Sequence, residues 1–63
     1  MQINLVVNEI EEKIRIDKYI SDNTELTRNK IQKLIDNDNI LVNGKSVKSS
    51  YKVSNNYEIT IID

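Results

Sequence analysis

The sequence predicts an α+β domain in which two short helices pack on a small, mostly antiparallel sheet. Apolar residues alternate at every second position near both ends of the chain, as in half-buried strands. Between these ends they recur at every third or fourth position, as in amphipathic helices. Asn43 and Gly44 stand between two β-like runs, and Asn-Gly is the strongest short hairpin signal because both residues accept a positive φ. Together these observations predict the element order β-α-α-β-β-β.

The first strand and the first helix are predicted from a change of period. Residues 2–9, QINLVVNE, alternate, whereas residues 11–23, EEKIRIDKYISDN, contain a helical repeat. The apolar positions are Ile3, Leu5 and Val7 in the strand and Ile16, Tyr19 and Ile20 in the helix. We therefore expect each element to bury one face.

The second helix is predicted over residues 27–39, TRNKIQKLIDNDN. Its apolar positions are Ile31, Leu34 and Ile35. Thr27 suits the N-cap because its hydroxyl can accept a hydrogen bond from a first-turn N–H. Asp and Asn tolerate the left-handed conformation that often terminates helices, so the sequence DND at 36–38 is expected to end this one.

Three strands are predicted after the second helix. They are ILV at 40–42, KSVK at 45–48 and YEITII at 57–62. The Asn-Gly turn joins the first two strands, and a second turn is expected at Asn55-Asn56. The helix pair is thus followed directly by a hairpin and a last strand.

The composition excludes several kinds of site. The 63 residues include no cysteine and no histidine, which excludes disulfides, cysteine-ligated metals and a histidine base. There is no glycine-rich phosphate loop and no catalytic or metal-ligand spacing of carboxylates. No apolar run approaches the roughly 20 residues that span a bilayer, and the start does not resemble a signal peptide. We expect a soluble, cytoplasmic, monomeric domain with no cofactor, no metal and no catalytic residue.

Charge is distributed unevenly along the chain. The formal net charge is −1, yet all nine basic residues lie within residues 13–52, which contain only five acidic residues. The middle of the chain therefore has a local excess of four positive charges, which favours contact with phosphates. Ordinary segregation of charge on a solvated surface explains this modest excess equally well.

Arg28 is the basic residue whose direction the second helix fixes best. With Ile31 as origin and a step of about 100° per residue, Arg28 lies at about 60°, on the border of the buried face. Lys30 and Lys33 lie well out in solvent on the same wheel. The Arg28 stem can cover apolar surface while its planar guanidinium points outward, near first-turn N–H groups that suit a phosphate.

Four segments in order resemble the S4 RNA-binding domain, and most closely the version at the N-terminus of RluA-type RNA pseudouridine synthases. They are RIDKYI at 15–20, TRNKIQKLI at 27–35, ILVNGKSV at 40–47 and VSNNYEI at 53–59. The match covers about residues 13–62, and the four segments stand at the spacing of the family. The resemblance implies the S4-like (alpha-L) fold.

The sequence departs mildly from the pattern of that family. Ile16 replaces leucine and Thr27 replaces serine, with similar chemistry. Asp38 and Asn56 stand where the family has glycine, and Tyr57 replaces the aspartate of the late Gly-Asp turn. Asp and Asn are the usual substitutes for glycine at a positive φ, so we expect the same backbone at Asp38 and Asn56.

The resemblance implies RNA binding through the helix pair and the hairpin. The implied contacts are Arg15, Lys18, Thr27, Arg28, Asn29, Lys33, Asn43, Lys45 and Lys48.

Several of these positions also have a purely structural interpretation. Arg15 and Asp17 can form a pair at the helix start, Thr27 is first an N-cap, and Asn43 is first a turn residue. Lys45 and Lys48 are expected on one face of their strand. Two other bases, Lys30 and Lys52, are expected to be solvated and uncommitted, and the three tyrosines to pack at the core or its rim.

The whole chain, 1–63, is interpreted as a single S4-like domain and an N-terminal fragment of a longer enzyme. The resemblance implies that it docks structured RNA for a covalently linked pseudouridine synthase domain outside this chain. We expect this RNA to be ribosomal. The catalytic aspartate of those synthases belongs to that other domain, so Asp17 is not assigned to catalysis.

Two alternatives remain open on the sequence alone. One is a free-standing S4 protein of the small heat-shock or ribosome-rescue type. The other is a ubiquitin-like sulfur carrier, which the initial MQI strand and the VNG hairpin resemble. A sulfur carrier acts through a C-terminal Gly-Gly, whereas this sequence has only Gly44 and ends in EITIID.

Overall fold

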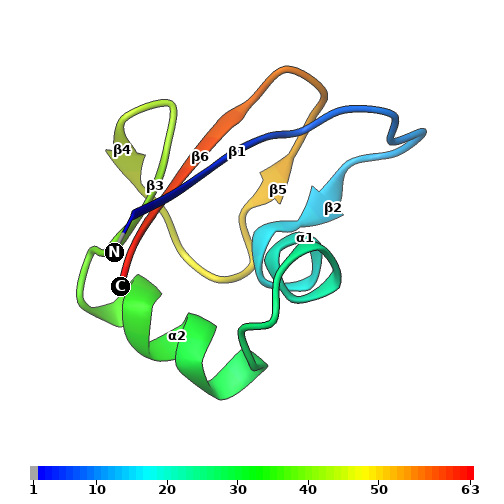
Figure 1. Cartoon of the computed structure of the whole chain (residues 1–63). Coiled ribbons are helices and arrows are strands. Elements are labelled where there is room, and N and C mark those ends of the chain that lie inside the picture. The colour runs from blue at the N-terminus through cyan, green and yellow to red at the C-terminus, as the bar shows by residue number, and fades with distance from the viewer. Residues whose placement is uncertain (1) are drawn as a thin grey trace.

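The computed structural model describes residues 2–63 and has the predicted α+β architecture (Figure 1). The helices are α1 (Ile16–Asn23) and α2 (Arg28–Asp36). The main sheet consists of β1 (Gln2–Val6), β3 (Ile40–Val42), β4 (Lys45–Ser46) and β6 (Glu58–Ile62). Its spatial order is β1-β6-β3-β4, and each neighbouring pair is antiparallel. Counted over the main sheet, the predicted order β-α-α-β-β-β is confirmed.

A second, two-stranded sheet was not predicted. It pairs β2 (Ile14–Arg15) with β5 (Lys52–Val53), again antiparallel. Because residues 14 and 15 belong to this ladder, the first helix begins at Ile16 and not within the EEK segment. Strands of two residues are too short to produce a recognisable period in the sequence.

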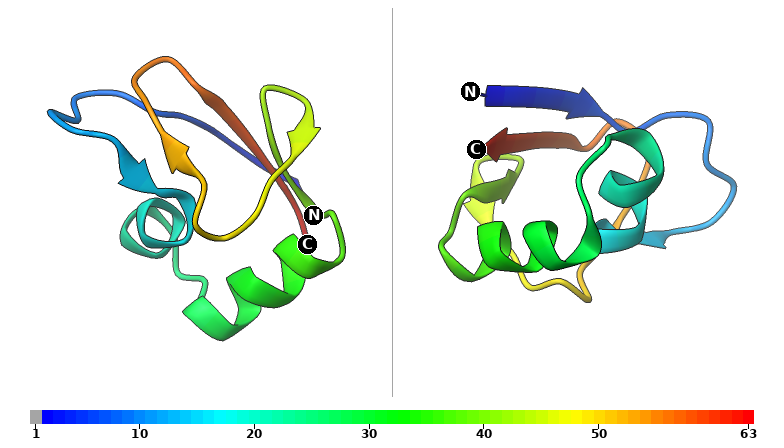
Figure 2. Two further views of the ribbon diagram at one scale, coloured as in Figure 1. Left: turned by 180° about the vertical axis from the view of Figure 1, so that it is seen from behind. Right: turned by 60° about the horizontal axis from the view of Figure 1, so that its bottom comes forward.

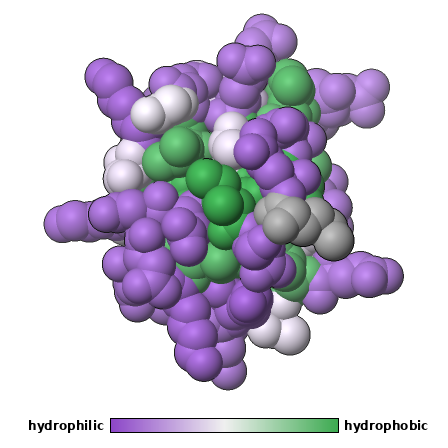
Figure 3. All heavy atoms as spheres, turned by 60° about the vertical axis from the view of Figure 1, so that its left-hand side comes forward, coloured by the Kyte–Doolittle hydropathy of each residue, from purple (hydrophilic) through white to green (hydrophobic). Residues whose placement is uncertain are grey.

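The core lies between the main sheet and the two helices, which cover the same side of it (Figure 2). The predicted apolar faces of both helices are buried. The buried cluster comprises Val7, Ile16, Tyr19, Ile20, Ile31, Leu34, Ile35, Ile40, Val42, Val53, Ile59 and Ile61. Seen from the β4 side, the surface is mainly hydrophilic, with apolar side chains gathered near the middle of that face (Figure 3). The buried cluster fixes the position of the helix pair relative to the hairpin.

The turns have the backbone that the sequence predicts. Asn43 (φ 51°) and Gly44 (φ 85°) both have positive φ, as a tight hairpin turn requires. Asp38 (φ 58°) and Asn56 (φ 74°) are also left-handed, which confirms the expectation for these two glycine substitutes. Asp38 N donates to Ile35 O at 3.0 Å, so the helix ends through a left-handed residue.

Candidate nucleic-acid interface

The N-terminus of α2 is capped and carries exposed polar residues. Thr27 Oγ1 accepts a hydrogen bond from Lys30 N at 3.2 Å, which confirms the predicted N-cap. Arg28 and Asn29, the first two residues of α2, are exposed. The cap satisfies one of the four N–H groups that a helix start leaves without an intrahelical partner, and the positive end of the helix dipole favours an anion there.

The flank of α2 that carries Arg28 faces the segment after β4. Arg28 and Gln32 are four residues apart and therefore lie on one flank. Gln32 and Lys48 line the same groove between α2 and residues 47–49. The other residues that line it are Ile35, Asp36, Asp38, Val47 and Ser49. Arg28 thus lies one helical turn before Gln32, which shares this groove with Lys48. Two carboxylates, Asp36 and Asp38, reduce the positive potential of the groove itself.

The remaining lysines of α2 point in other directions. Lys30 Nζ lies 3.0 Å from Asp63 Oδ1, so the expectation that Lys30 is uncommitted is wrong. Lys33 is exposed in the last turn, on the side of the helix away from the core. The two lysines therefore lie apart from the flank that carries Arg28.

Arg15 is held by a buried carboxylate. Its Nε and Nη2 donate to the two oxygens of Asp17 at 3.2 and 3.1 Å. Asp17 is only 9% exposed and also accepts from Lys18 N at 2.7 Å, whereas the Arg15 side chain is 52% exposed. The helix-start pair is therefore real, and it fixes the guanidinium in one direction with its other edge open. Lys18 Nζ forms an exposed ion pair with Asp22 at 3.1 Å.

The β2–β5 ladder brings a further cation to Arg15. Lys52 is the cross-strand partner of Arg15. In addition, Ile16 N donates to Tyr51 O at 2.7 Å, so residues 48–52 run beside the start of α1. The sequence interpretation treated Lys52 as uncommitted charge and missed this proximity, because a two-residue ladder leaves no pattern in the sequence.

Asn43 is a structural residue of the hairpin. Its N donates to Glu58 O at 2.8 Å, and its Oδ1 accepts from Glu58 N at 3.0 Å. The side-chain oxygen is thus used in tying the turn to β6. An RNA contact from Asn43 would have to use its amide N–H groups.

Lys45 and Lys48 do not share a strand face as predicted. β4 ends at Ser46, and Lys48 lies in a turn that is closed by a 3.0 Å bond from Tyr51 N to Lys48 O. Lys45 instead lines a second groove, whose other residues are Val42, Asn43, Ser46, Val47 and Tyr51. Val47 lines both grooves, so the two lysines flank one continuous edge of the molecule.

Four of the predicted contacts, Arg28, Lys33, Lys45 and Lys48, form no ion pair within residues 2–63. Lys45, Lys48 and Lys52 lie within the segment from the hairpin to β5, and Arg15 is the cross-strand partner of Lys52.

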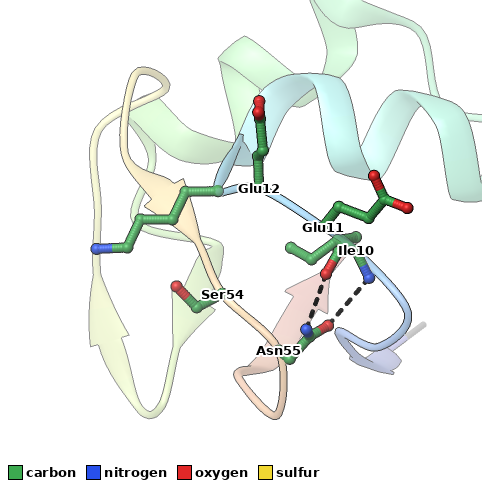
Figure 4. A pocket seen from close by; sticks show the side chains of 6 residues that line it. Ile10, Glu11, Glu12, Ser54 and Asn55 are labelled. Carbon is green, nitrogen blue, oxygen red and sulfur yellow. Dashed lines mark hydrogen bonds between the residues drawn. The ribbon is translucent and has the colours of Figure 1, made fainter.

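A further hollow has the opposite character (Figure 4). Its lining includes Glu11 and Glu12, whose side chains point away from Asn55. Asn55 makes two hydrogen bonds to the backbone of Ile10, one in each direction. Within residues 2–63 no cluster of three or more carboxylates is arranged to hold a metal ion, and neither helix is long and apolar enough to cross a membrane.

Comparison with known proteins identifies the family. The sequence model of the S4 domain matches residues 14–59, which include both helices, the hairpin and the β2–β5 ladder. The chain belongs to the S4 domain family. This membership favours the RNA-binding interpretation over a ubiquitin-like sulfur carrier.

Two curated relatives of this S4 domain are RNA-modifying enzymes by name. An uncharacterized RNA pseudouridine synthase of Chlorobaculum parvum is 44% identical over 52 residues, or 81% of this chain. The 23S rRNA (cytidine-2'-O)-methyltransferase TlyA of Campylobacter jejuni is 43% identical over 42 residues, or 67% of this chain. The matched parts cover only 16% and 17% of those two proteins. No solved structure matches the chain.

Proposed function

We propose that this S4 domain is the RNA-docking module of a longer enzyme that modifies structured ribosomal RNA, with a pseudouridine synthase as the first candidate. The family match and the two relatives support RNA binding. The observation that carries the proposal is the position of Arg28: exposed, without an ion pair within residues 2–63, at a capped helix start, on the flank that faces Lys48.

The interface would recognise RNA by shape and phosphate charge. Arg28, Lys45 and Lys48 lie along one edge and can follow a phosphate backbone, as suits folded RNA. Arg15 is pre-oriented by Asp17, so it loses little side-chain freedom when it binds a phosphate. Thr27, Asn29 and the amide of Asn43 would add polar contacts, with Lys18 and Lys33 at the periphery.

Catalysis would take place in a covalently linked domain outside these residues. Asp17 is committed to Arg15 and to the backbone of Lys18, so it has a structural task here. The proposed role of this chain is to position RNA without a cofactor, as a monomer in the cytoplasm. The linked domain would isomerise uridine to pseudouridine.

A second candidate parent is an RNA 2'-O-methyltransferase, which the similarity to TlyA favours. The docking role of this chain would be the same in both cases, since matches over 52 and 42 of the 63 residues must overlap. A free-standing S4 protein on the ribosome or on tRNA is a third possibility. The activity of the complete protein on ribosomal RNA distinguishes the three.

The proposal is tested by titrating the isotope-labelled chain with a ribosomal RNA hairpin and following backbone amide shifts. We expect shifts at residues 15–18, 27–33 and 43–48, and a dissociation constant in the micromolar range. Arg28→Glu should weaken binding at least tenfold. Glu is favourable near a helix N-terminus, so loss of the fold is not the expected cause.

Lys13→Glu is the matched control, because it makes the same charge change at an exposed lysine outside the proposed interface that, like Arg28, forms no ion pair within residues 2–63. It should weaken binding only about twofold through the overall charge. Shifts scattered over the rest of the chain, or equal effects of the two variants, would refute the proposed interface.

A further inference from the structure

The groove between the hairpin and β5 is lined by both an aromatic residue and a basic residue. Its lining includes Lys45, Asn43 and Tyr51, and its volume is about 510 Å³. This lies within the range of about 300–1,000 Å³ that is typical of small-molecule sites. The groove is therefore large enough to admit a nucleotide.

Tyr51 is anchored at its backbone and exposed at its ring. Its N donates to Lys48 O at 3.0 Å and its O accepts from Ile16 N at 2.7 Å. The residue is nevertheless 38% exposed, in contrast to Tyr19, which is 8% exposed in the core. A ring on a fixed backbone loses little freedom when a planar group packs on it.

Tyr57 supports the Tyr51 ring. The two ring centroids are 6.5 Å apart and the ring planes are inclined by 31°, which is within the usual range of aromatic pairs. Desolvation, together with the neighbouring Tyr57 phenol, raises the pKa of the Tyr51 hydroxyl above its ordinary value. A tyrosine hydroxyl is neutral at physiological pH even at its ordinary pKa of about 10, so Tyr51 does not repel a phosphate.

The residues that line this groove include no carboxylate, which sets it apart from three other hollows. The groove of Lys48 contains Asp36 and Asp38, the hollow of Figure 4 contains Glu11 and Glu12, and a groove beside β1 contains Glu58. A cation, an amide and an aromatic ring without a nearby acid are complementary to a nucleotide, since a base has a π-face and its phosphate is anionic.

We propose that Tyr51 stacks on an unpaired base of the bound RNA while Lys45 contacts the phosphate of that nucleotide. The inference rests on the proposed RNA binding and specifies its substrate: a helix with a bulged or looped-out nucleotide next to the phosphates gripped by Arg28 and Lys48. The groove would then select RNA that is locally unpaired, in addition to the charge that attracts any RNA.

The test uses two RNA hairpins that differ only in a single bulged 2-aminopurine nucleotide. Binding of the bulged RNA should change the 2-aminopurine fluorescence and shift the Tyr51 ring protons upfield. Tyr51→Phe, which keeps the ring, should preserve both signals. Tyr51→Ala should abolish the fluorescence change and raise the Kd for the bulged RNA about tenfold, or about 1.4 kcal/mol. Its Kd for the fully paired RNA should change less than twofold.

Tyr51→Leu separates the loss of stacking from the loss of packing, because leucine keeps apolar volume but cannot stack as a ring does. It should behave like the alanine variant. Equal losses on both RNAs, or no loss on either, would overturn the stacking role. If the unmodified chain binds neither RNA, the proposed function fails as well, whereas normal binding of both RNAs by Tyr51→Ala refutes this inference alone.

Discussion

At the residue scale, this chain uses Asp and Asn where the turns need a left-handed backbone. Of the five residues with positive φ within residues 2–63, Gly44 is the one glycine, Glu9 (φ 56°) is the exception, and Asp38, Asn43 and Asn56 have φ values of 58°, 51° and 74°. Their short polar side chains tolerate this conformation better than other residues do, but at a cost that glycine avoids. At these positions a glycine would adopt the same backbone conformation with less strain in the folded state.

Asp38→Gly is predicted to stabilise the fold by about 0.5 kcal/mol. Relief of left-handed strain is worth about 1 kcal/mol, and the greater entropy of glycine in the unfolded chain offsets about half of it. Asp38 also lines the groove of Lys48, so the substitution removes a negative charge there. The measurement is a thermal melt, with a rise in Tm of about 2–4 °C.

Asp36→Gly is the control, because Asp36 ends α2 with ordinary helical geometry. Glycine there should lower stability by up to about 1 kcal/mol. A fall in Tm for both variants would show that Asp38 is not strained.

Residue patterns were sufficient for local features and insufficient for long-range ones. The Thr27 cap and the left-handed Asp38 follow from interactions within a few residues, so the sequence alone predicts them. The Lys30–Asp63 ion pair and the proximity of Lys52 to Arg15 join distant segments and leave no periodic pattern. The prediction that Lys45 and Lys48 share a face was wrong for two reasons. Residues three apart on a strand point to opposite faces, and the strand ends at Ser46, where the chain turns.

At the element scale, hydrogen bonds from side chains hold segments that are not paired in a β-ladder. The loop between β1 and β2 is tied to the turn before β6 at two points. Asn56 N donates to Val7 O at 2.7 Å, and the Asn55 amide bonds to both backbone groups of Ile10 at 3.1 and 2.9 Å. The Asn55 side chain thus takes the place of a backbone partner for Ile10 (Figure 4).

Asn55→Ala is predicted to destabilise the fold by about 1 kcal/mol, since it removes two hydrogen bonds that each contribute about 0.5 kcal/mol at an exposed site. Amide exchange at Ile10 should become faster, while exchange at Val7, which donates to Tyr57 O, should change little. Urea denaturation and hydrogen exchange measure the two effects.

The matched control is Asn8→Ala, an exposed asparagine of the same loop whose side chain makes no hydrogen bond within residues 2–63. It should leave both quantities unchanged. If the exchange rate of the Ile10 amide does not change in Asn55→Ala, the Asn55–Ile10 hydrogen bonds do not stabilise this loop.

At the scale of the whole molecule, ion pairs divide the basic residues of a chain whose net charge is −1 into two groups. Two lysines are neutralised by carboxylates, Lys18 by Asp22 and Lys30 by Asp63. Lys45, Lys48 and Arg28 form no such pair within residues 2–63. The number of phosphates gripped should therefore be smaller than the nine bases of the sequence.

The salt dependence of RNA binding counts these phosphates. If about four to five are contacted, a plot of log K against log salt concentration should have a slope of about −3 to −4. Lys48→Gln should reduce the magnitude of the slope by about 1, as loss of one phosphate contact does. Lys30→Gln should leave it nearly unchanged, because Lys30 is paired with Asp63. Tyr51→Ala should weaken binding of bulged RNA at every salt concentration without changing the slope, since stacking releases no counterion. A slope near −8, or equal effects of Lys48→Gln and Lys30→Gln, would show that RNA contacts basic residues over the whole surface and not mainly Arg28, Lys45 and Lys48.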